Sequence, residues 1–406
     1  MKNYLIILTT ALLSVSLAGQ EVYNWKALAE RYASKNRNQA LMAALVQNGG
    51  VEYYGFGQIS RELGGPPDEN TLFEIGALTE VFTTTLMTKE AMEGDFDLSK
   101  PIREFLPKDT DVPLFQPQKC VELVLPTSAG GAPQRILSCT PDPLSGEISV
   151  ALCDLATHSS GLPNSGLGLY DWHPIGLAYR LTGPRPGFDR AAFFRKLAEC
   201  PLKTMPGSEY RFSNIGIALI GHLLSEAKGE PFDILLEKEL LQPLGLNDTR
   251  FQLTPEQQSH FAPGFNDKGK PVDHWNFEGM SPAAGLKSSA HDLGGFVVAN
   301  LRNDNSRWAA VMEQTQQARI DVSFPGLTRP TQAGYGWLIS TLSPESNQPV
   351  VWMYGGTEGF RAFIGFIKEH GLGIVLLSNS ANEIRELGFS MLAELYGAHL
   401  QAGGGK

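Results

Sequence analysis

The spacing of apolar and polar positions predicts a helix near each end of the chain. After a capping Asn24, apolar residues recur every three or four positions over 24–34, as expected of a helix with one buried face. Segment 382–397 repeats this spacing near the other end. The apolar positions are Trp25, Leu28, Ala29 and Tyr32 in the first segment, and Ile384, Leu387, Met391 and Leu395 in the second.

Strand-like apolar runs follow the first predicted helix and precede the last one. The early run, 40–59, carries a hairpin signal at Asn48-Gly49-Gly50. Four late runs have the same character: "YGWLIS", "PVVWMYGG", "RAFIGFI" and "GIVLLSN". Because strands occur at both ends of the chain, we expect both ends to contribute to one sheet.

The middle of the chain has helical periodicity broken by loops rich in proline and glycine. We therefore expect an α/β (α+β) protein with a sheet domain built from 19–75 and 286–397, and a mostly helical domain, 76–285, inserted into it. Segment 108–147 is predicted to be a long loop insertion, either a lid or a lineage-specific addition. Residues 398–406 are predicted to be a flexible tail.

Composition narrows the classes of partner. The chain has 406 residues, 42% of them hydrophobic and 19% charged, so it can bury a large core. Its net charge is −10, and no run of lysine or arginine is present. This balance argues against a nucleic-acid partner and against binding to anionic membrane surfaces.

The first residues, 1–18, are predicted to be a cleaved export signal. Lys2 supplies the charged start, Leu5 to Leu13 the apolar run, and Ser16 and Ala18 a small-x-small cleavage site. The alternative is an uncleaved membrane anchor, for which the apolar run is short. No later stretch predicts a transmembrane segment, so we expect a periplasmic or secreted protein.

Four cysteines are compatible with an exported chain. Cys120 and Cys139 flank a segment rich in proline, glycine and serine, which favours a disulfide between them and leaves Cys153 to pair with Cys200. A zinc site is the competing interpretation, but no CxxC or HxxxH spacing supports it. We expect neither a metal nor another cofactor.

Six segments together carry a family pattern. They begin "FEIGALTEVFTTTLM", "DLATHSSGLP", "PGSEYRFSNIG", "LLQPLGLNDTRF", "AAGLKSSAHDL" and "WMYGGTEGF", in that order. The chain resembles the serine β-lactamase and penicillin-binding protein superfamily, in the branch of class C β-lactamases, D-alanyl-D-alanine carboxypeptidases and esterases. The resemblance extends from about residue 43 to residue 396 and implies the β-lactamase/penicillin-binding fold, in which an antiparallel sheet is flanked by terminal helices.

The resemblance implies that four chemical groups are missing from the family's active site. Ala77 matches the nucleophilic serine, and Glu80 matches the lysine that helps to deprotonate it. Phe212 matches the tyrosine that relays the proton, although Asn214 of the same motif is kept. Met353 matches the lysine or histidine of the third motif. This pattern implies the loss of acyl-transfer chemistry.

The leading hypothesis is a non-catalytic binding or scaffolding protein of the cell envelope. Its ligand would be a small molecule, a peptide or a protein segment in the former cleft. The expected rim consists of Glu80, Asn214, Gly355, Gly356 and Thr357. Because Glu80 should point into the cleft as an anion, it should disfavour carboxylate ligands. The alternatives are a hydrolase of esters, amides or D-alanyl peptides that uses Glu80 with water, and a decayed copy without function.

Other polar residues near the motifs have structural interpretations. Thr79 should face away from position 77, because two helical steps turn it by about 200°. Tyr354 should pack on the opposite side of its strand from Met353. Ser213 and His158 match structural family positions, and Lys287 is predicted to cap or solvate the next helix.

Overall fold

A computed structural model describes residues 24–35, 39–62, 64–125, 134–164, 189–275, 278–323 and 327–403. An eight-stranded antiparallel sheet forms its centre, in the order β11-β12-β13-β14-β15-β16-β1-β2. The bounds of these strands are β1 Ala40–Gln47, β2 Gly50–Gly57, β11 Ile320–Val322, β12 Thr331–Ala333, β13 Leu338–Thr341, β14 Pro349–Gly356, β15 Arg361–Ile367 and β16 Leu372–Ser378. The predicted sheet from both chain ends is therefore confirmed.

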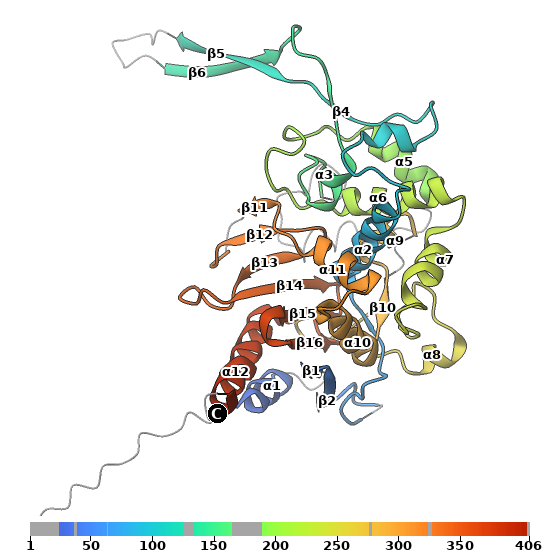
Figure 1. Cartoon of the computed structure of the whole chain (residues 1–406), viewed down its shortest axis with the longest axis vertical. Helices are drawn as coiled ribbons and strands as arrows, with labels where there is room; N and C mark the ends of the chain where they lie inside the picture. The colour runs from blue at the N-terminus through green and yellow to red at the C-terminus, as the bar shows by residue number, and fades with distance from the viewer. Residues whose placement is uncertain are drawn as a thin grey trace, which may run out of the picture.

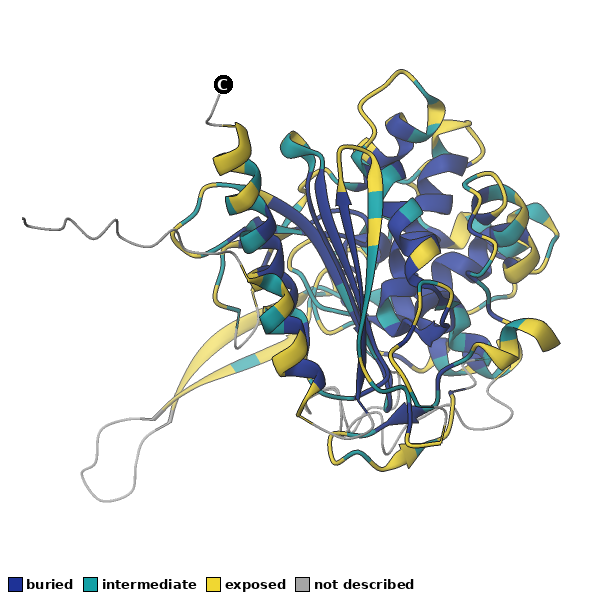
Figure 2. Cartoon of the chain, turned by 90° about the horizontal axis from the view of Figure 1, so that it is seen from below, coloured by how far each residue is buried: buried dark blue, intermediate teal, exposed yellow. Residues whose placement is uncertain are grey.

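Helices cover both faces of this sheet (Figures 1 and 2). The terminal helices α1 (Trp25–Ala33) and α12 (Arg385–Gly403) pack together on one face. The opposite face carries α2 (Thr79–Met92), α10 (Ala290–Leu301) and α11 (Arg307–Thr315). The remaining helices are α3 Leu152–Ala156, α5 Arg190–Ala198, α6 Asn214–Lys228, α7 Phe232–Leu236, α8 Pro255–Ser259 and α9 Ser281–Ala284, with short turns η1 Gly76–Leu78, η2 Ile102–Phe105, η3 Glu237–Leu241, η4 Glu278–Met280 and η5 Lys368–His370.

The local signals at the chain ends fold as predicted, with one exception. Asn24 Oδ1 caps α1 by accepting from the Ala27 N–H at 3.0 Å. Asn48 and Gly49 both have positive φ in the tight turn between β1 and β2. Helix α12 continues to Gly403, so the prediction of a flexible tail is wrong for residues 398–403, which continue the helix. The predicted signal, 1–18, lies outside the described residues.

Helix α2 is central rather than amphipathic, since its residues from Thr79 to Glu90 are all buried. The hydroxyls of Thr83, Thr84, Thr85 and Thr88 donate to carbonyl groups, which makes this burial tolerable. Thr83 donates to Pro282 O at 2.6 Å, and Thr84 donates to Tyr335 O at 3.0 Å. The helix is thereby bonded both to α9 and to the loop between β12 and β13.

Short strand pairs complete the fold. They are β3 Phe73–Glu74 with β10 Lys287–Ser288, β4 Leu114–Phe115 with β7 Ile148–Ser149, β5 Gln118–Leu125 with β6 Gln134–Pro141, and β8 Gly264–Phe265 with β9 Pro271–Val272. Within 108–147, the two eight-residue strands β5 and β6 pair as a hairpin, so the prediction of a loop throughout this segment is wrong. Figure 1 shows that β5 and β6 extend away from the body, which does not fit a lid.

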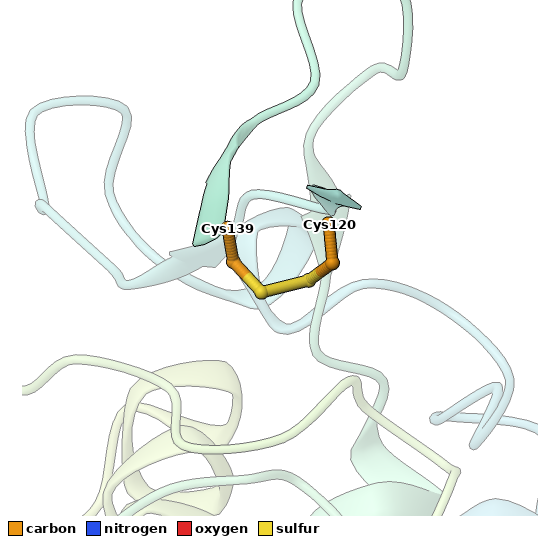
Figure 3. Close-up of a disulfide and its surroundings, with 2 residues drawn as sticks. All are labelled: Cys120 and Cys139. Atoms are coloured by element: carbon orange, nitrogen blue, oxygen red, sulfur yellow. A yellow bond between two sulfur atoms is a disulfide. The ribbon is translucent and has the colours of Figure 1, made fainter. Parts of the chain in front are cut away.

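One predicted disulfide is present and the other is not. Cys120 and Cys139 are bonded across the β5–β6 hairpin, with their Cα atoms 4.0 Å apart (Figure 3). Cys153 and Cys200 are both thiols, so the prediction that they pair is wrong. Cys153 lies on the first turn of α3, whereas the Cys200 thiol turns back onto the preceding helix and bonds to Lys196 O at 3.3 Å.

Candidate functional site

The turn that leads into α2 rests directly on the end of β14. Gly76 has φ +51°, and a Cβ added to it would lie 2.6 Å from Gly356 N. A Cβ added to Gly355 would lie 2.0 Å from Ile75 O. Both glycines are therefore required for this close approach of backbone to backbone. Ala77 lies at this junction and is partly exposed, with a methyl group at the position matched to the nucleophile.

Glu80 is fully buried and hydrogen-bonded to His158. The distance from its Oε2 atom to His158 Nε2 is 2.9 Å. The other ring nitrogen, Nδ1, accepts from the Ser213 N–H at 3.1 Å. Since Nδ1 accepts, the ring proton is on Nε2 and is donated to Glu80. With Nδ1 occupied as an acceptor, the contact with Glu80 is a hydrogen bond donated by Nε2.

The prediction that Glu80 points into the cleft is wrong, because its side chain is fully buried against His158. Burial raises the pKa of Glu80 above its ordinary value of 4.5, and the interactions with His158 offset part of that rise. Its Oε1 atom is buried and has no hydrogen-bond partner among the described residues. The glutamate side chain is shorter than the lysine that the family carries at this position. Its carboxyl group stays in the interior, where it contacts His158.

Glu80 should make the stability of the protein depend on pH. Because its folded pKa is raised, Glu80 contributes stability that is present below pH 4.5 and is lost as the pH rises through the folded pKa. We expect the free energy of unfolding of the wild type, relative to Glu80→Gln, to fall over that pH range. Urea denaturation of both proteins across a pH series measures this difference. A difference that stays constant with pH would contradict a raised pKa.

Two aromatic rings enclose His158. The ring of Phe212 lies 4.7 Å from the imidazole centroid, and that of Tyr210 lies 5.6 Å away, edge on. Burial raises the pKa of Tyr210 well above its usual range, so its hydroxyl stays protonated. Tyr210 was missed in the sequence. It stands two positions before Phe212, and the rings of both residues contact His158.

Met353 and Tyr354 lie on opposite faces of β14, as predicted. Met353 is buried, and with His158, Tyr210 and Trp337 it lines a cavity of about 10 Å³, enough for about one water molecule. Tyr354 stacks on Trp352 on the face covered by α12. The third-motif position therefore contributes an apolar wall rather than a charge.

The predicted rim residues differ in what they contact. Asn214 begins α6, and its Nδ2 donates to Asn164 Oδ1 at 2.8 Å. The Thr357 hydroxyl oxygen is buried without a hydrogen-bond partner among the described residues, next to Gly356 at the end of β14. Hydrogen bonds link Glu80 through His158 to Ser213, the neighbour of Asn214. The predicted rim thus gathers around α2, the start of α6 and the end of β14.

The remaining polar candidates have structural roles. Thr79 Oγ1 accepts from Leu286 N at 3.2 Å, and Ser213 caps α6, as expected. The prediction that Lys287 caps the next helix is wrong, because Ser289 is the cap of α10. Lys287 Nζ instead donates to Phe251 O at 2.8 Å and borders a separate cavity of about 410 Å³ among α6, α7 and α9.

The described part of the chain has neither a metal-binding cluster nor a membrane-spanning helix. No group of three or more His, Cys, Asp or Glu side chains is placed there to hold a metal ion. Among the same residues, no helix is both long and apolar enough to cross a bilayer.

Comparisons with known proteins agree with the fold. The family model for Beta-lactamase matches residues 25–389. A β-lactamase of Pseudomonas fluorescens is 26% identical over 379 residues, covering 84% of this chain and 88% of the relative. The D-alanyl-D-alanine-carboxypeptidase/endopeptidase AmpH of Escherichia coli K12 is 23% identical over 317 residues, covering 76% of this chain and 70% of the relative.

The D-alanine carboxypeptidase AmpC from Burkholderia cenocepacia has a similar solved structure, with a TM-score of 0.68 at 20% identity over 92% of this chain and 99% of that chain. The sheet, its covering helices and the turn before α2 define a protein of the serine β-lactamase and penicillin-binding protein superfamily. The chain belongs to the β-lactamase family.

Proposed function

We propose that this chain is a non-catalytic member of the family that binds a small molecule, a peptide or a protein segment in the cleft beside Ala77. The observation that carries this proposal is the buried hydrogen bond between Glu80 and His158. The family places a lysine base at position 80, whereas this chain holds there a carboxyl to which solvent has no access. A base in this position cannot activate a water molecule from the cleft.

The neighbouring positions support the same proposal. Ala77 has no nucleophilic atom, Phe212 has no phenol oxygen, and Met353 is buried without a charge. The turn rests closely on the end of β14, and we propose that the Ala77 N–H binds an oxygen atom of the ligand there. Such a cleft can hold a ligand without converting it. The predicted signal, 1–18, would export the protein to the periplasm or the medium.

A turnover panel on the purified mature protein tests this proposal. The substrates are activated esters, a chromogenic cephalosporin and a D-alanyl-D-alanine peptide, and the control is Glu80→Gln. We expect no hydrolysis above that of the control. Hydrolysis by the wild type that is lost in Glu80→Gln would instead establish the alternative of a relocated hydrolase.

Binding separates a recognition protein from a decayed copy. A ligand present at 100 times its Kd stabilises a folded protein by about 2.7 kcal/mol. Thermal denaturation in the presence of cell-wall fragments and envelope extracts should therefore reveal a saturable shift. A decayed copy would show neither turnover nor such a shift.

A further inference from the structure

The β5–β6 hairpin concentrates the exposed aliphatic side chains of the described residues. Val121, Leu123, Val124, Ile136 and Leu137 are between 39% and 65% exposed. The other large hydrophobic side chains with comparable exposure, apart from Leu144 near the base of the hairpin, lie singly on separate elements: Met92, Met205, Ile234 and Leu400. Figure 2 shows the hairpin as an exposed arm. Exposed aliphatic side chains gathered on one element, unlike single ones, are typical of surfaces that bind a partner.

The register of the hairpin gives each face its own chemistry. Leu123 is opposite Ile136, and Val121 lies on the same face opposite Ser138, so three aliphatic side chains form a stripe on that face. The other face carries the Cys120–Cys139 disulfide, an ion pair of 3.3 Å between Glu122 and Arg135, and the exposed side chains of Val124 and Leu137. The disulfide joins the two strands, which otherwise form only a two-stranded ribbon of marginal stability.

The hydrogen-bond pattern identifies which backbone groups point outward. Asp142 N donates to Pro117 O at 2.8 Å, which makes this a hydrogen-bonded pair. Pairs alternate along an antiparallel ladder, so Cys120 and Cys139 form a non-hydrogen-bonded pair, and their Cα separation of 4.0 Å agrees. By the same alternation Glu122 and Leu137 direct their N–H and C=O groups outward. Both outer edges lack a neighbouring strand in the described residues.

The two edges are not equivalent. Pro141 occupies an outward position on β6 and has no N–H, so that edge lacks a donor. On β5, Gln118, Cys120, Glu122 and Val124 all present an N–H outward. The edge of β5 is therefore the better template for an added strand.

We infer that the hairpin is a dimerisation arm, in which β5 of one copy pairs antiparallel with β5 of a second copy across a two-fold axis. A second copy is the favoured occupant, because the hairpin of another chain offers the same aliphatic stripe and an equally free edge. The net charge does not prevent this choice. The chain carries −10, so two bodies repel each other, whereas the hairpin strands hold Lys119, Glu122 and Arg135 and meet away from both bodies.

The pairing also limits where the axis lies. An axis through Glu122 would place two carboxylates directly opposite each other, which is destabilising. Axes through Val121 or Leu123 would oppose two aliphatic side chains and extend the stripe across four strands. The inference goes beyond the proposed function, since it does not depend on what the cleft binds.

Proline substitutions at two cross-strand partners test the edge. Glu122→Pro removes an outward N–H from β5, and Leu137→Pro removes one from β6, while neither removes a bond within the hairpin. Sedimentation velocity of the full chain over a wide concentration range should show a dimer with a Kd of roughly 1–100 µM, given the small interface. We expect Glu122→Pro to raise this Kd at least tenfold and Leu137→Pro to preserve the dimer. Mass spectrometry should confirm the Cys120–Cys139 disulfide in both variants.

A charge substitution within the stripe provides an independent arm. Leu123→Asp should abolish the dimer, whereas the matched variant Ile234→Asp, at a similarly exposed site on α7, should not. A wild type that stays monomeric at its highest soluble concentration would overturn the inference. So would a dimer that survives both Glu122→Pro and Leu123→Asp, or a monomer whose hairpin binds phosphatidylglycerol vesicles instead.

Discussion

Restoring the serine alone, in Ala77→Ser, is expected to leave the protein without measurable penicillin acylation. The new hydroxyl would lie beside Glu80, whose Oε2 atom is already bonded to His158 and whose raised pKa favours the neutral acid. Phe212 has no oxygen to relay a proton. In a comparable hydrolase, removing the base alone costs about as much as removing the whole catalytic set, about 10⁶ in turnover.

Intact-mass spectrometry after incubation with a penicillin measures this directly. The related β-lactamase of Pseudomonas fluorescens serves as the positive control and should give turnover about 10⁶ times faster. A covalent adduct on Ala77→Ser would mean that a base is still present. The variant Ala77→Ser/Glu80→Gln would then show whether Glu80 is that base.

The sheet could be predicted because a buried strand is visible in its own sequence as a run of apolar residues. The run at β14 and the residues of β15 after Arg361 are apolar, and the tight turn after β1 is specified by Asn48 and Gly49. Such signals lie within short stretches of sequence, so they can be interpreted without knowledge of the fold. The second family motif likewise correctly indicated Ser213 as a structural residue, since its hydroxyl caps α6.

The environment of Glu80 could not be predicted, because it depends on a residue 78 positions away and on that residue's tautomer. The position match placed Glu80 where the family has its lysine, and the match carries no information about the partner. His158 matches a structural family position. The sequence does not show that its Nε2 faces Glu80 while its Nδ1 accepts from the Ser213 N–H. Position in a motif therefore placed Glu80 on the correct helix but predicted neither its burial nor its partner.

The hairpin was missed for a different reason. Strands are recognised from one buried face, and β5 and β6 have none, since almost every described side chain on them is exposed. Short runs such as Val121 to Val124 are interrupted by Glu122, and the connecting residues are typical of a loop. Only the two cysteines indicated that the strands lie side by side, and that indication was correct.

Returning the family lysine to position 80 is expected to destabilise the fold by about 3–5 kcal/mol. In Glu80→Lys an ammonium group would face the Nε2–H of His158, so two donors would meet where one donor and one acceptor now pair. The imidazole cannot turn its acceptor toward the lysine without releasing the Ser213 N–H. Burial leaves the new charge without water to solvate it.

Glu80→Gln is the matched control, because its amide oxygen can still accept from His158 Nε2 and its volume is nearly unchanged. We expect it to remain within about 1 kcal/mol of the wild type, as is usual when a hydrogen bond is retained. Urea denaturation of the three proteins at one pH gives both differences. If Glu80→Lys proves as stable as the wild type, the lysine has found another acceptor, and the site has kept room for the family's base. If it unfolds as expected, the pair of Glu80 and His158 is itself an obstacle to restoring the chemistry, because a working base would require His158 to be replaced as well.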